Sequence, residues 1–104
     1  EYSKSMFEYW TEDDFASSFR KMLTIEQFRS EEMQKLYQQY LVAGPASYVK
    51  ALFESIGIVN AKDKAARFYA VMHFYYSLYD GAADKEKVKV EFVSAIKSLV
   101  QDLA

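Results

Sequence analysis

His73 is the only histidine of the chain, and it is the side chain best suited to acid–base or ligand-binding chemistry near neutral pH. A metal site would need further ligands, but the sequence has no cysteine, no second histidine and no Glu-x-x-His spacing. We therefore expect no metal site and no cofactor. Beside Tyr69, Met72 and Tyr76, the imidazole is suited either to a hydrogen bond with a pocket ligand or to one with a neighbouring side chain, and both alternatives stay open.

Adjacent carboxylates occur twice, at Asp13-Asp14 and at Glu31-Glu32, and pairs of carboxylates can perform general acid–base catalysis. Adjacent residues on a helix do not face each other, whereas acidic residues at a helix start are stabilised by the helix dipole. The sequence also contains no Ser/His/Asp set, phosphate-binding loop or nucleotide fingerprint. We therefore expect no catalytic residues, and an enzyme is the weakest of the alternatives that we consider.

The stretch that carries His73, Ala65–Tyr79, is almost continuously apolar and aromatic. Only Arg67, His73 and Ser77 interrupt it, and on a helix these three positions share roughly one third of the circumference. The remaining surface must be covered, and a small monomer seldom covers a helix so completely. A second copy of the chain or an enclosed ligand is the expected cover.

The composition is typical of one folded domain spanning residues 1–104, with 51% hydrophobic and 17% aromatic residues. The net charge of −2 and the solvated lysines of Lys85–Lys89 argue against nucleic-acid binding by this segment. The longest uncharged stretches, Leu36–Val49 and Phe68–Tyr79, are shorter than the roughly 20 residues that a membrane span needs. We expect a soluble, cytoplasmic protein with no membrane partner, and the lack of cysteine agrees with a reducing compartment.

The elements that position these residues are all predicted to be helices, because sustained strand-like alternation is absent and the chain has only 3 Gly and 1 Pro. The fold class is therefore all-α, with about six helices. Apolar spacing places these helices up to about Trp10, and at about Glu12–Leu23, Ser30–Gly44, Pro45–Ile56, Ala61–Tyr79 and Asp84–Leu103.

Capping residues mark the expected helix boundaries. The expected N-terminal caps are Thr11, Thr24, Ser30 and Asn60, of which Thr24 would begin a short extra turn. Gly44 and Pro45 predict a helix stop followed at once by a helix start, and so a sharp corner between two helices. Gly57 and Asp80-Gly81 are the expected stops of the two helices that follow.

The order of these anchors resembles that in a known family. The resemblance rests on the stretch Arg20–Leu41 (RKMLTIEQFRSEEMQKLYQQYL), and then on Pro45, Tyr48, Leu52, Phe53, Gly57, Ala65-Ala66, Phe68-Tyr69 and Tyr76–Asp80. This series is similar to the C-terminal domain of the tetracycline-repressor (TetR) family of bacterial transcriptional regulators. It covers about Phe7–Leu103, and the domain is recognised by helix order and aromatic anchors rather than by a catalytic motif.

The resemblance implies an antiparallel helical bundle that binds a small-molecule effector and forms a homodimer. The last two long helices, about Ala61–Tyr79 and Asp84–Leu103, would pair with their copies as a four-helix bundle. DNA would be bound only through an N-terminal helix-turn-helix domain, which does not precede Glu1 in this chain.

Two sets of candidate residues follow. The expected pocket for an apolar or aromatic effector draws on Phe19, Met22, Phe28, Tyr37, Tyr48, Phe53, Tyr69, Met72, His73 and Tyr76. The expected dimer interface draws on Phe74, Leu78, Val88, Phe92, Ala95, Ile96, Leu99 and Leu103. The alternative to a ligand-sensing domain is a helical protein-interaction module that dimerises but encloses no small molecule.

Overall fold

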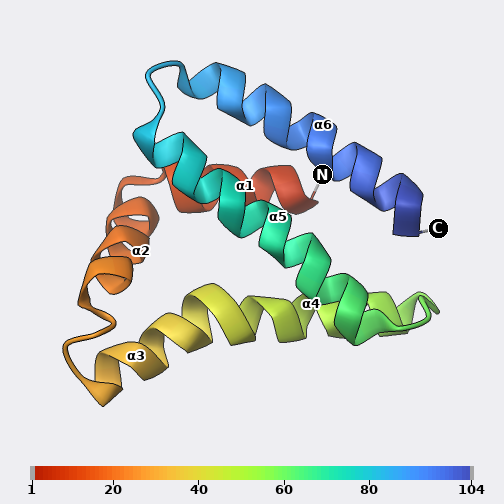
Figure 1. The fold of residues 1–104 in the computed structure, drawn as a ribbon, viewed down its shortest axis with the longest axis horizontal. Coiled ribbons are helices and arrows are strands. Elements are labelled where there is room, and N and C mark those ends of the chain that lie inside the picture. Colours follow the sequence, from red (N-terminus) through yellow and green to blue (C-terminus); the bar gives the residue numbers. More distant parts are fainter. Residues whose placement is uncertain (1, 104) are drawn as a thin grey trace.

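The computed structural model describes residues 2–103, with the side chains of residues 3–102, and this part of the chain is helical without any strand. The all-α expectation is confirmed. The elements are α1 (Tyr2–Glu12), α2 (Asp14–Glu26), α3 (Glu31–Tyr37), the π-helical turn η1 (Gln38–Val42), α4 (Ala43–Ser55), α5 (Ala61–Gly81) and α6 (Lys85–Leu103). Figure 1 shows α5 crossing the middle of the molecule, with α6 along one side and the α3–α4 segment along the other.

The expected break at Gly44-Pro45 is wrong, because α3, η1 and α4 follow one another as one uninterrupted helical rod (Figure 1). Proline has no N–H, and its ring clashes with the carbonyl four residues earlier in a regular α-helix. The π-helical turn widens the helix just before Pro45: the Ala43 N–H bonds to the Gln38 carbonyl five residues back. The chain thus accommodates the proline without turning a corner.

Two expected caps at the start of the chain are also wrong. α1 continues through Thr11, whose hydroxyl donates back to the Phe7 carbonyl (2.6 Å), and Asp13 caps α2 by accepting the Ala16 N–H (2.9 Å). Thr24 starts no new turn, since its hydroxyl donates to the Arg20 carbonyl within α2 (2.8 Å). Both threonines therefore bond backward inside a helix, an alternative open to every Ser and Thr.

The later boundaries follow the sequence more closely. The Ser30 hydroxyl caps α3 by accepting the Met33 N–H (3.1 Å), as expected. Gly57 follows α4 in the left-handed region, with φ of 81°. Asn60 is the N-cap residue of α5, as expected, but it adopts a left-handed conformation and its side chain makes no capping hydrogen bond.

The larger core gathers around the inner face of α5. The Phe7 ring of α1 stacks on Phe92 of α6 with centroids 4.3 Å apart, and Phe53 of α4 meets Phe68 edge-on at 5.6 Å. A second, smaller core forms between α2 and the α3–η1 segment around Leu23, Tyr37 and Leu41. On the molecular rim, Lys89 of α6 donates to Glu8 (3.1 Å) and Glu12 (2.8 Å) of α1.

The molecule is flat, with extents of 39 × 34 × 17 Å and a radius of gyration of 14.1 Å. A compact chain of this length would have a radius of gyration of about 13 Å. One consequence is that α5 is covered on its inner side only. Phe74 and Leu78 on its outer side remain 58% and 41% exposed, so no described residue of the chain covers this side fully.

Candidate functional site

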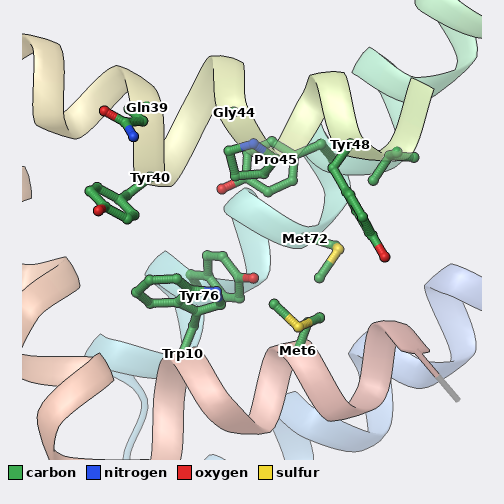
Figure 2. A pocket seen from close by; sticks show the side chains of 11 residues that line it. Met6, Trp10, Gln39, Tyr40, Gly44, Pro45, Tyr48, Met72 and Tyr76 are labelled. Atoms are coloured by element: carbon green, nitrogen blue, oxygen red, sulfur yellow. The ribbon is translucent and has the colours of Figure 1, made fainter. Parts of the chain in front are cut away.

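A cavity of about 420 Å³ lies between α1, the η1–α4 segment and α5 (Figure 2). Its volume falls within the usual range of small-molecule pockets. It is lined by Met6, Trp10, Gln39, Tyr40, Gly44, Pro45, Tyr48, Val49, Tyr69, Met72 and Tyr76. In Figure 2, Gly44, Pro45 and Tyr48 project from one wall, and Met6 and Trp10 face them from α1.

The π-helical turn shapes one wall of this cavity. Because Pro45 has no N–H, it cannot satisfy the carbonyl of Leu41, four residues earlier. The hydroxyl of Tyr69, on α5, donates to that carbonyl and so ties η1 to α5 beside the cavity. Gly44 has no room for a side chain, since a Cβ there would lie 1.7 Å from the Gln39 carbonyl oxygen.

The described lining has no acidic, basic or histidine side chain. Rings of Trp10, Tyr40, Tyr48 and Tyr76 form much of it, joined by the thioethers of Met6 and Met72. Aromatic rings and thioethers pack well against flat apolar molecules, and methionine adapts its shape to what it touches. The described lining is therefore suited to contact with an apolar molecule.

A clamp of charged groups lies behind Tyr76. The Arg20 guanidinium makes two hydrogen bonds to Asp80 (2.7 and 2.9 Å) and a third from Nε to the Trp10 carbonyl (3.0 Å). Its Cζ also lies 5.3 Å from the centroid of the Tyr76 ring. Arg20 thus connects α1, α2 and α5, and two of the residues that it contacts, Trp10 and Tyr76, line the cavity.

His73 does not line this cavity. Its Nε2 lies 3.4 Å from the Tyr37 hydroxyl, and the imidazole borders two separate surface hollows. Burial, helped by the positive charge of Arg20, lowers the pKa of His73 below its usual 6.5. Of the two roles that the sequence leaves open for His73, the structure shows the hydrogen bond to a neighbouring side chain, that of Tyr37.

Apart from His73, the candidate pocket residues divide into three groups. Tyr48, Tyr69, Met72 and Tyr76 line the cavity. Phe19, Tyr37 and Phe53 pack into the two cores instead. Met22 and Phe28 lie on the surface, Phe28 with 85% of its area exposed.

The candidate interface residues are similarly divided. Val88, Phe92 and Ile96 are buried inside the chain itself, Ala95 and Leu99 are half-buried, and the side chain of Leu103 lies outside the described residues. Phe74 and Leu78 are the exposed members.

Sequence reasoning missed seven of the lining residues: Met6, Trp10, Gln39, Tyr40, Gly44, Pro45 and Val49. Met6 and Trp10 share one face of α1, which is a usable signal for burial but not for a cavity. The sequence predicts a corner at Gly44 and Pro45, and a corner there would not place these residues in the wall of a cavity.

Among the described residues, no group of three His, Cys, Asp or Glu side chains is placed to hold a metal ion, and no helix is both long enough and apolar enough to cross a membrane. In comparisons with known proteins, no family model, curated protein or solved structure matches the chain.

Proposed function

We propose that the chain is a ligand-sensing and dimerisation domain, which binds a small apolar or aromatic molecule in the cavity between α1, α4 and α5. The observation that carries this proposal is the cavity itself, about 420 Å³ in volume and lined by five large aromatic side chains and two thioethers without a charged group. Pockets of this size and lining are the usual sites of small-molecule binding.

The resemblance to the TetR family suggests how such binding is used. DNA binding would belong to a separate domain of a longer regulator, and the dimer would set the spacing of its two DNA-reading modules. A ligand that binds one arrangement of the dimer more tightly than another shifts the population toward it. The contacts of the cavity wall with Arg20 support this reading, because Arg20 also holds α1 and α2 against the end of α5.

Binding is tested with Trp10, the only tryptophan of the chain and part of the lining. A panel of apolar aromatic compounds is titrated while Trp10 fluorescence and the melting temperature are followed, since a ligand of the folded state raises the latter. The variant Val49→Phe extends a lining side chain toward the cavity, and Val59→Phe makes the same change at an exposed site outside it. We expect binding in the wild type and in Val59→Phe, and its loss in Val49→Phe.

The competing interpretation is a protein-interaction module, favoured by the exposed Phe74 and Leu78 on α5. It predicts a self-associating chain whose Trp10 fluorescence and melting temperature respond to no compound of the panel. That result would contradict ligand sensing while leaving dimerisation in place.

A further inference from the structure

The cavity differs from an ordinary apolar crevice in having one hydrogen-bonding amide at its edge. Gln39, on η1, is the only amide side chain of the described lining, and no described residue bonds to it. Its neighbour Gln38 points elsewhere and donates to Gln34 (3.0 Å). The two adjacent glutamines therefore differ in that Gln39 borders the cavity and keeps its donor and acceptor available.

Charge is the second distinguishing property of the site. A charged ligand would lose its hydration among rings and thioethers without gaining a counter-ion, and that loss is costly. A cationic ligand meets a further obstacle, because the guanidinium of Arg20 already lies against the Tyr76 ring at 5.3 Å from its centroid. An anionic ligand gains little from Arg20, which is already bonded to both carboxylate oxygens of Asp80.

The shape of the lining is the third distinguishing property of the site. The rings of Trp10, Tyr40 and Tyr48 offer flat surfaces that pack best against another flat ring system. Figure 2 shows Gln39 and Tyr40 together at one end of the cavity, with Met6 and Met72 at the middle. A bound molecule would thus place an apolar body over the thioethers and a polar edge toward η1.

We infer that the ligand is an uncharged, flat aromatic molecule carrying one hydrogen-bonding group, and that Gln39 selects for that group. This inference rests on the proposed function and narrows it to a ligand class and a specificity residue. It makes Gln39 a positioning residue for the ligand's polar edge.

The test uses four compounds that share the naphthalene ring: naphthol, methylnaphthalene, naphthoate and naphthyltrimethylammonium. Calorimetric titration of the wild-type chain gives the dissociation constant of each. We expect naphthol to bind most tightly, methylnaphthalene more weakly, and the two ions least. Tighter binding of either ion than of naphthol would overturn the inference but leave the proposed function intact. Binding of none of the four would overturn both.

Variants then isolate Gln39. Gln39→Leu removes the amide and should weaken naphthol about three- to tenfold, the effect of one lost hydrogen bond, without weakening methylnaphthalene. Gln38→Leu, the matched control on the same helical turn, should change neither. Equal effects of the two substitutions on naphthol, or none from Gln39→Leu, would overturn the role of Gln39.

A variant that introduces a charge tests the same position by a gain of affinity, which a loss of folding could not produce. Gln39→Glu keeps the size of the side chain and adds a carboxylate at the cavity edge. It should tighten naphthyltrimethylammonium about two- to fivefold, as an exposed ion pair does. No gain for the cation in Gln39→Glu would place the ligand's polar edge away from η1 and overturn the inference.

Discussion

At the scale of single residues, the surroundings of His73 favour its neutral form. The imidazole is half-buried on α5 beside the Tyr37 hydroxyl, and the positive charge of Arg20 further disfavours a second proton. Both effects lower the pKa of His73 below 6.5, with burial the larger. Protonation of His73 therefore opposes folding.

This environment predicts a pH dependence of stability. Because the unfolded chain binds the His73 proton more readily than the folded chain, the stabilising contribution is fully present above pH 6.5 and is lost as the pH falls below it. His73→Gln removes the titration, so its free energy of unfolding should fall less steeply than that of the wild type between neutral and mildly acidic pH. Urea unfolding at several pH values measures both slopes, and parallel slopes would contradict the assignment.

At the scale of elements, the Arg20–Asp80 clamp joins three helices that are far apart in the sequence. The Arg20 side chain is only 6% exposed. It donates to the carbonyl of Trp10, near the end of α1, and pairs with the carboxylate of Asp80, near the end of α5. A guanidinium fixes both partners at once because its donors lie in one plane. The clamp sets where α1 and α2 lie relative to α5, and hence the width of the cavity.

Asp80→Asn should lower the free energy of unfolding by about 2 kcal/mol, because it leaves the buried guanidinium without its charged partner. Asp63→Asn is the matched control on the same helix, where the carboxylate pairs with Arg67 and both side chains are largely exposed. That substitution should cost less than about 0.5 kcal/mol. Urea unfolding followed by helical circular dichroism compares the two, and similar costs would mean that the clamp contributes no more than a surface pair.

The π-helical turn makes a second prediction for an element. Gly44→Ala should lower the free energy of unfolding by about 2 kcal/mol, because its Cβ would overlap the Gln39 carbonyl oxygen and force η1 to rearrange. Gly81→Ala meets no atom within 4 Å and should stabilise α5 by up to about 1 kcal/mol. Thermal unfolding of the two variants checks this opposition in sign, and a neutral Gly44→Ala would show that the turn yields easily.

The same turn explains how far the sequence predicts the elements. The spacing of apolar residues predicts α5 and α6 correctly, because the apolar positions recur in every turn of these two long helices. The prediction is wrong at Gly44-Pro45, because these two residues are compatible both with the end of a helix and with a π-helical turn. The difference is decided by Tyr69, 24 residues beyond Pro45, whose hydroxyl satisfies the carbonyl that the proline leaves unpaired.

The candidate site was less predictable than the helices. Tyr48, Tyr69, Met72 and Tyr76 line the cavity, but the sequence marks them only as large and apolar, which is equally true of Phe53 in the core. The cavity exists because α1 and the η1–α4 segment do not pack directly against each other, so it depends on the distance between these elements. That spacing is set by the long-range contacts of Arg20 and Tyr69, which no local pattern contains.

At the scale of the whole molecule, the flat shape leaves one side of α5 without cover. Its inner residues are buried by α1, α4 and α6, whereas Phe74 and Leu78 face outward next to exposed alanines and glycine. Small residues beside a large aromatic ring permit close approach of a second helix. We propose that this side of α5 meets its copy in a two-fold symmetric dimer, as the family resemblance implies.

The dimer proposal predicts different outcomes for two phenylalanines. Phe74→Glu should weaken dimerisation about 30-fold or more without loss of helicity, because the ring is exposed in the single chain and the charge enters a two-fold interface twice. Phe92→Glu should unfold the chain instead, since Phe92 is 1% exposed and stacks on Phe7.

Sedimentation equilibrium gives the dimer dissociation constant, and circular dichroism gives the helicity of the same samples. Val59→Glu is the control, an equally drastic change at a site 71% exposed outside the proposed interface, and it should leave the dimer unchanged. A Phe74→Glu chain that dimerises like the wild type would move the interface away from α5. A wild-type chain that stays monomeric would contradict the dimer itself, and the exposed ring of Phe74 would then need a different partner.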